Sequence, residues 1–128
     1  MPLFVVQKIS DALNEAAQPI KGSRLLLLGM AYKADVHDTR ESPSLEIMRQ
    51  LIQRGGDVRY CDPWVSEVEL DGATHRSVEW SADEVAAADC VVVLTAHTVF
   101  LENPLWDQAA RIVDTRHAVP DGPTVHQI

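Results

Sequence analysis

A four-leucine strand, a glycine turn and a proline-started helix follow one another from residue 24 onward, and this order most constrains the fold. Residues 24–28 read Arg-Leu-Leu-Leu-Leu, an apolar run typical of a strand buried on both faces of a parallel sheet. Gly29 follows, where a side chain would obstruct a tight turn. Ser42 is a good N-cap and Pro43 a good first helical residue, so the sequence predicts that a helix begins there.

The loop between this strand and this helix carries two cations, Lys33 and Arg40, among acidic residues. The carboxyl ends of parallel strands and the backbone N–H groups of a helix N-terminus are both places where α/β proteins bind anionic ligands. The pattern therefore predicts an anion pocket that suits a phosphorylated ligand. The alternative is that these cations are solvated or paired with acidic neighbours, as most surface cations are.

Strand and helix patterns alternate along the rest of the chain. Residues 67–80 have no readable pattern, and the turn-rich tail over 120–128 is expected to be loose. The alternation predicts an α/β fold with a doubly wound parallel sheet, a Rossmann-like half. The expected elements are a helix ending at Gly55-Gly56, a strand over 58–60, a short helix from Ser81 to Ala88, a strand over 90–94, a weak helix over 104–110 and a strand over 111–114.

Composition excludes several classes of protein. The net charge of −8 disfavours nucleic acid as a partner, because its phosphates would be repelled. No apolar run approaches the roughly 20 residues that a membrane-spanning helix needs, so no membrane partner is expected. Cys61 and Cys90 form no C-x-x-C redox pair and no zinc site, and no signal-peptide pattern is present. A single domain in a reducing compartment, the cytoplasm, is the expectation.

Five motifs, in a fixed order, resemble the C-terminal UDP-binding domain of the UDP-glucose/GDP-mannose dehydrogenase family. The resemblance runs from about Met1 to about Arg116, nearly the whole chain. A set of motifs in fixed order is far more specific than a lone glycine fingerprint. The motifs are Gly-Met-Ala-Tyr-Lys at 29–33, Asp-Thr-Arg-Glu-Ser-Pro at 38–43, Tyr-Cys-Asp-Pro at 60–63, the run from Ala88 to Thr95-Ala96-His97, and Ile-Val-Asp-Thr-Arg at 112–116.

The resemblance implies part of an NAD-dependent UDP-sugar 6-dehydrogenase, in which the C6 hydroxyl of a nucleotide-sugar is oxidised to a carboxylate in two steps. Tyr32 and Lys33 match an aromatic-lysine pair that contacts the substrate, and Arg116 matches a substrate-contacting arginine. Arg40 matches the arginine that reaches NAD, a cofactor bound mainly by an N-terminal domain of the family. Lysine and arginine are both suitable partners for phosphate.

Two parts of the family chain are missing from this sequence: the N-terminal Rossmann domain with its Gly-rich fingerprint, and the helical middle domain with the catalytic cysteine. No G-x-G-x-x-G fingerprint occurs, and Cys61 and Cys90 are expected to be buried structural residues rather than the family's catalytic cysteine. The resemblance therefore implies that this chain alone is inactive. It also divides the chain into the end of a central linking helix over 1–20, a UDP-sugar-binding domain over 21–120 and a tail over 121–128. On this reading, Met1 is an internal methionine of a longer gene or the start of a truncated one.

The N-terminal segment has one apolar stripe, formed by Val5, Ile9 and Leu13. This stripe is expected to pack on the small domain or against a second copy, because family members commonly dimerise through this region. The expected partners are thus a UDP-sugar and either the remaining domains of the dehydrogenase or a second copy in a homodimer.

Several alternatives remain open at this point. Arg116 has a surface ion pair with Asp114 or Asp121 as its alternative. His97 lies at a strand end, where it either faces the ligand crevice or has its hydrogen bonds satisfied internally. Tyr32 and the residues after Lys33 look closer to enzymes of UDP-N-acetylhexosamines than to those of UDP-glucose. The alternative function is a free-standing nucleotide-sugar-binding or interaction module without catalysis.

Overall fold

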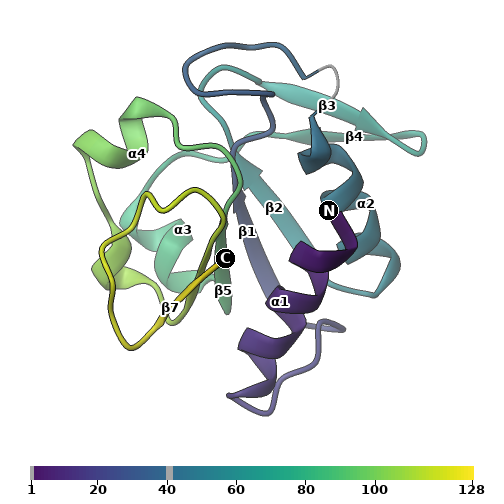
Figure 1. Cartoon of the computed structure of the whole chain (residues 1–128). Helices are drawn as coiled ribbons and strands as arrows, with labels where there is room; N and C mark the ends of the chain where they lie inside the picture. Colours follow the sequence, from purple (N-terminus) through teal and green to yellow (C-terminus); the bar gives the residue numbers. More distant parts are fainter. Residues whose placement is uncertain (1, 40–41) are drawn as a thin grey trace.

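A five-stranded parallel sheet forms the centre of the structure, a computed structural model that describes residues 2–39 and 42–128 (Figure 1). The strands lie in the order β2-β1-β5-β6-β7, and every neighbouring pair is parallel. The chain reverses its direction of travel across the sheet between β1 and β5, so the predicted doubly wound sheet is confirmed. The strands are β1 Arg24–Leu28, β2 Asp57–Cys61, β5 Cys90–Val93, β6 Ile112–Asp114 and β7 Val125–Gln127.

Helices cover both faces of this sheet (Figure 1). On one face lie α1 (Pro2–Asn14) and α2 (Pro43–Gln53), which pack against each other. On the other lie α3 (Ala82–Ala87), α4 (Thr98–Glu102) and the 3₁₀ turn η1 (Trp106–Gln108). The four leucines of β1 serve both layers, because Leu25 and Leu27 join the core under α1 and α2 while Leu26 and Leu28 join the core under α3.

The apolar stripe of α1 is buried within this chain. Val5, Ile9 and Leu13 have exposed fractions of 7%, 0% and 0%. They belong to the core that also contains the leucines of β1 facing α2. Leu3 and Phe4 lie outside the stripe and are 64% and 47% exposed. Of the two expected positions for the stripe, packing against the rest of this chain is the one observed.

The segment without a readable pattern forms a β-hairpin. Its strands, β3 (Glu67–Leu70) and β4 (Ala73–Arg76), pair in antiparallel fashion as a separate two-stranded sheet. Asp71 and Gly72 join them with φ of 50° and 83°. Asp-Gly between two short strands is a strong signal for a turn with two positive φ angles, so the sequence contained the information that would have predicted this hairpin.

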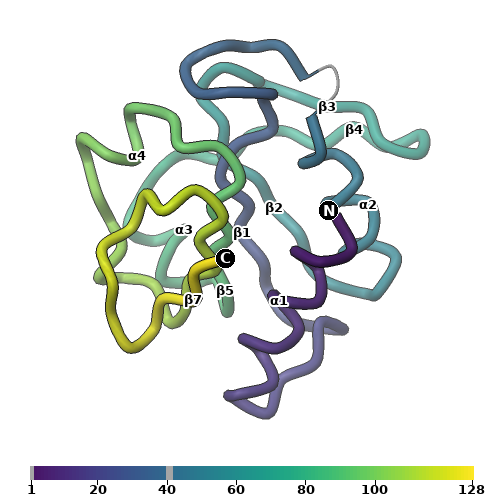
Figure 2. Tube along the Cα trace, in the orientation of Figure 1, coloured from purple at the N-terminus to yellow at the C-terminus, as the bar shows by residue number. Residues whose placement is uncertain are grey.

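The C-terminal part differs from expectation in three places. The weak helix expected over 104–110 is only the single turn η1, and α4 was not predicted at all. The tail expected to be loose contains β7, which pairs in parallel with β6. Figure 2 follows this tail, in yellow, as it loops outward and returns beside the sheet. A three-residue edge strand with one valine has no hydrophobic pattern of its own and takes its position from the neighbouring strand.

Candidate functional site

The loops that follow β1 and β5 meet at the carboxyl edge of the sheet, where the strand order reverses. Gly29, which follows β1, has φ of +98°, and a Cβ built on it would lie 2.4 Å from the Thr95 Cβ. Only glycine allows the two backbones to come this close, which confirms the predicted reason for Gly29. Crevices at such reversal points are where open α/β sheets bind ligands.

Asp62, directly after β2, holds the start of the β1–α2 loop. Its carboxylate is 1% exposed and accepts hydrogen bonds from the backbone N–H groups of Met30 at 2.7 Å, Ala31 at 3.0 Å and Trp64 at 2.8 Å. Burial alone would raise the pKa of Asp62, but these N–H donors and the His97 ring outweigh it, so the pKa lies below its usual value. Asp62 is therefore a buried, ionised anchor for the loop.

His97, after β5, is completely buried and joins two parts of the same edge. Its Nε2 lies 2.9 Å from the Asp62 Oδ2, and its Nδ1 accepts a hydrogen bond from the backbone N–H of Asp35 at 2.8 Å. A ring that accepts at Nδ1 and donates at Nε2 is the neutral Nε2–H tautomer. Of the two alternatives for His97, the structure shows the histidine with internally satisfied hydrogen bonds.

The N-terminus of α2 opens beside this loop, as predicted. Ser42 is the N-cap, and its hydroxyl accepts a hydrogen bond from the Ser44 N–H at 3.3 Å. The carbonyl of Ala31 accepts from the Thr95 hydroxyl at 2.8 Å. Residue 31 is therefore fixed to the end of β5, and Tyr32 and Lys33 leave from that point toward solvent.

Arg116 reaches across the edge from the loop after β6. Its Nε donates to the carbonyl of Leu94 at 2.8 Å, which fixes the guanidinium against the end of β5. Its backbone N–H donates to Asp114, whose second oxygen accepts from the N–H of Val119. The Asp114 carboxylate is thus occupied by the turn. Neither Asp114 nor Asp121 forms the ion pair with Arg116 that the sequence left open, so that alternative is wrong for the described part of the chain.

Arg116 and the first turn of α2 line one cavity of about 250 Å³. Pockets that enclose a whole small molecule range from about 300 to 1,000 Å³, so this cavity suits one portion of a ligand, such as a diphosphate. The positive end of the α2 dipole and a fixed guanidinium both favour a negative charge there. The lining residues are Pro2, Val5, Pro43, Ser44, Ile47, Leu94, Thr115 and Arg116.

Lys33 and Tyr32 do not line this cavity. Both are exposed, Tyr32 by 49%, on the loop beside it. Among residues 2–39 and 42–128, no carboxylate forms an ion pair with Lys33 or Arg116. Arg40, the residue expected to reach NAD, lies outside the described residues.

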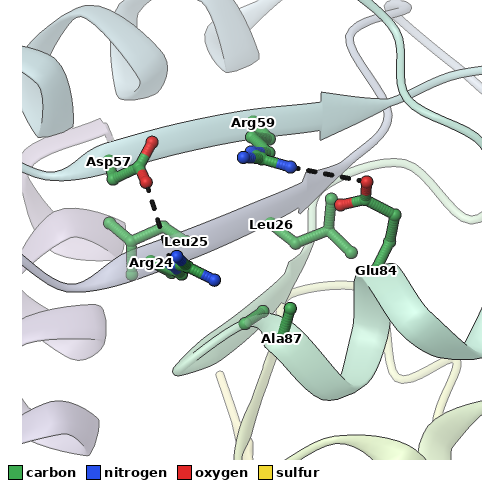
Figure 3. A pocket seen from close by; sticks show the side chains of 8 residues that line it. Arg24, Leu25, Leu26, Asp57, Arg59, Glu84 and Ala87 are labelled. Atoms are coloured by element: carbon green, nitrogen blue, oxygen red, sulfur yellow. Dashed lines mark hydrogen bonds and ion pairs between the residues drawn. The ribbon is translucent and has the colours of Figure 1, made fainter.

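Two other pockets are less suited to a phosphorylated ligand. A groove of about 750 Å³ on the α4 side of the loop has Asp35 and Glu102 as its charged lining residues, which would repel phosphate. The pocket between β1, β2 and α3 is shown in Figure 3 and has a volume of only about 20 Å³. Its cations are already paired, Arg24 with Asp57 at 4.0 Å and Arg59 with Glu84 at 3.4 Å.

The two cysteines are buried, as expected. Desolvation by burial is the main reason that the pKa of Cys61 and that of Cys90 are each raised to about 12. A thiol that stays protonated near neutral pH is not a nucleophile. Among the described residues, no group of three or more His, Cys, Asp or Glu side chains could hold a metal ion, and no helix is long and apolar enough to cross a membrane.

Comparisons with known proteins agree with this arrangement. Residues 26–125 match the family model described as "UDP-glucose/GDP-mannose dehydrogenase family, UDP binding domain". A UDP-N-acetyl-D-mannosamine dehydrogenase of Methanococcus maripaludis is 35% identical over 101 residues, which cover 78% of this chain and 22% of that protein. A UDP-glucose 6-dehydrogenase of Rickettsia bellii is 39% identical over 116 residues, which cover 89% of this chain and 26% of that protein.

A solved structure shares the fold over nearly the full chain. The UDP-D-ManNAc dehydrogenase of Pyrococcus horikoshii superposes with a TM-score of 0.82 at 24% identity. The superposition covers 99% of this chain and 30% of that protein. This chain therefore spans less than a third of the length of each of these three proteins, at 22%, 26% and 30%.

Proposed function

Because this chain belongs to the UDP-glucose/GDP-mannose dehydrogenase family, as its UDP binding domain, we propose that it binds the diphosphate of a UDP-sugar at the carboxyl edge of its sheet. In this proposal Arg116 and the N-terminus of α2 hold the diphosphate, and Tyr32 and Lys33 contact the nucleotide-sugar from the adjacent loop. Arginine can offer two parallel N–H donors to a phosphate, and lysine a mobile positive charge.

One observation supports this proposal more than any other. Arg116 is fixed by the Leu94 carbonyl through its Nε at 2.8 Å and lines the cavity that α2 also lines. Among residues 2–39 and 42–128, its terminal nitrogens have no hydrogen-bond partner. A preorganised cation beside a helix N-terminus loses little side-chain freedom when an anion binds. In a chain with net charge −8, such a local concentration of positive potential is what an anionic ligand requires.

We propose that the whole protein oxidises the C6 hydroxyl of its UDP-sugar with NAD, and that this chain alone is inactive. Residues 29–39 follow β1 without forming a helix and carry no Gly-rich fingerprint, so the proposal places no dinucleotide cradle after β1. In the proposal NAD is bound mainly by residues outside this chain, with Arg40 as a contact. The other domains of the dehydrogenase, or a second copy, complete the site.

Titration calorimetry with UDP tests the proposed site. The isolated chain is expected to release heat with UDP and none with NAD. Arg116→Ala and Lys33→Ala should each weaken UDP binding, by about tenfold if one charge-assisted contact is lost. Arg24→Ala is the matched control, because it removes one exposed cation at the opposite end of β1. A chain that binds no UDP, or that binds equally well in all three variants, would contradict the site.

The sugar is proposed to be an N-acetylhexosamine. This rests on Tyr32 and the residues after Lys33, and the Methanococcus maripaludis relative, named as a UDP-N-acetyl-D-mannosamine dehydrogenase, supports it. The Rickettsia bellii relative, named as a UDP-glucose 6-dehydrogenase, supports the alternative. Competition between UDP-N-acetylhexosamines and UDP-glucose for the UDP-bound chain distinguishes the two.

A further inference from the structure

We infer that Asp62 and His97 are positioning residues, which hold the Tyr32–Lys33 segment in the shape that contacts the bound nucleotide-sugar. This inference rests on the function proposed above. Both side chains are completely or almost completely buried, and neither lines the cavity that contains Arg116. They act through the loop backbone and do not touch the ligand.

The pair holds this segment at both of its ends. Before the segment, Asp62 accepts the backbone N–H groups of Met30 and Ala31 at 2.7 and 3.0 Å. After the segment, His97 accepts the N–H of Asp35 at 2.8 Å. The pair itself is joined by the 2.9 Å contact between Nε2 and Oδ2. Residues 32–34 therefore lie between two fixed points, and they include Tyr32 and Lys33 of the proposed site.

The far end of the segment is fixed a second time. The carboxylate of Asp35 accepts hydrogen bonds from the backbone N–H of Thr98 at 2.9 Å and from the Thr98 hydroxyl. These bonds are the main cause of the lowered pKa of Asp35, which keeps this carboxylate ionised. Thus Asp35 connects the loop to Thr98, which follows His97 and begins α4.

The energetic argument favours an ordering role. A buried carboxylate and imidazole are costly to desolvate, and this cost is offset only when all their hydrogen bonds are made. Here the bonds that offset it go largely to the loop after β1, at the buried Met30 and Ala31 and at the exposed Asp35. A loop without such bonds would sample many backbone conformations and lose more entropy when it binds a ligand.

Two polar variants separate the two hydrogen bonds of His97, the one to Asp62 and the one from Asp35. In His97→Gln the side-chain amide N–H can still donate to Asp62, but no acceptor remains for the Asp35 N–H. In His97→Asn the side-chain carbonyl can still accept from Asp35, but the donor to Asp62 is lost. His97→Ala removes both hydrogen bonds. Val85→Ala is the control for general destabilisation, because Val85 is fully buried on α3, at the opposite face of the sheet.

The readouts are amide hydrogen exchange by NMR in the free chain and calorimetric titration with UDP, at a temperature where every variant is folded. We expect the Asp35 amide to exchange faster in His97→Gln and His97→Ala, while His97→Asn retains its protection. UDP affinity should fall by about tenfold in His97→Ala and by less in His97→Gln and in His97→Asn, which each lose one hydrogen bond. Val85→Ala should bind UDP as the wild type does.

Three outcomes decide the matter. Unchanged Asp35 exchange together with wild-type UDP affinity in the folded His97 variants would overturn the positioning role. An affinity loss in Val85→Ala equal to that in His97→Ala would also overturn it, because the effect would then reflect stability alone. A wild-type chain that binds no UDP would instead refute the proposed function, and the Asp35 exchange rates would still decide whether His97 orders the loop.

Discussion

The Nε of Arg116 donates to the carbonyl of Leu94 at 2.8 Å, so the arginine after β6 is fixed by the end of β5. Leu94 also lines the cavity that Arg116 shares with Pro43 and Ser44 of α2. This contact fixes the exposed Arg116 side chain beside the cavity that the first turn of α2 also lines. It also distinguishes Arg116 from an ordinary surface cation.

Arg116→Lys is therefore not a conservative change. A lysine ammonium can either replace the bond to Leu94 or contact a phosphate, but it cannot do both with a planar set of donors. We expect UDP affinity to fall by about tenfold, close to the effect of Arg116→Ala. Titration calorimetry measures it, and Lys21→Arg, a change between the same two residue types away from this cavity, is the control. Wild-type affinity in Arg116→Lys would show that charge alone suffices.

Gly29→Ala should destabilise the fold strongly. The new Cβ would lie 2.4 Å from the Thr95 Cβ, on a backbone with φ of +98°. We expect a loss of about 3 kcal/mol or more in the free energy of unfolding, from overpacking and backbone strain together.

Gly72→Ala is the matched control for Gly29→Ala. Gly72 also has a positive φ, +83°, but no atom lies within 4 Å of its added Cβ. Its cost should be only about 1 kcal/mol, the strain of the backbone alone. Urea denaturation of the two variants compares them, and equal losses would contradict the close approach of Gly29 to Thr95.

The stability of the chain should depend on the ionisation of Asp62. The pKa of Asp62 is lowered in the folded state from its ordinary value of 3.8, because hydrogen bonds from His97, Met30 and Trp64 outweigh the opposing effect of burial. The stabilisation is thus fully present above the unfolded pKa and is lost as the pH falls through the folded pKa. Asp62→Asn should be less stable at neutral pH and should lose less of its stability on acidification.

Urea denaturation between about pH 7 and about pH 2.5 measures this difference, provided that both proteins remain folded without urea. Asp107→Asn is a suitable control, because Asp107 is exposed on η1 and makes none of these loop contacts. Parallel pH profiles of the wild type and Asp62→Asn would mean that Asp62 contributes no ionisation-linked stability.

Cys61 and Cys90 should be unreactive in the folded chain. Burial raises the pKa of each thiol to about 12, so the thiolate is a very small fraction at pH 8. A disulfide-forming reagent such as Ellman's reagent should label neither cysteine rapidly in buffer and both in denaturant. Rapid labelling of one thiol in the native protein would identify it as accessible, and Cys61→Ser or Cys90→Ser would show which.

Local patterns predicted the elements that position the site. The run of leucines in β1 and the Ser42-Pro43 start of α2 depend on burial and capping, which are encoded within a few adjacent residues. The hairpin was predictable as well, from Asp71-Gly72. In contrast, the three-residue β7 has no periodic pattern, and its position depends on the exposed edge of β6.

The amino-acid sequence by itself determined the parallel α/β fold, the glycine turn after β1, the cations Lys33 and Arg116, and the family to which the chain is similar. Only the tertiary structure decided which side chains meet at the carboxyl edge. His97 and Asp62 are 35 residues apart, and Arg116 and Leu94 are 22 apart. Their contacts arise because parallel strands bring their carboxyl ends to one edge, and the order of strands in a sheet is a property of the packed chain and not of any local segment.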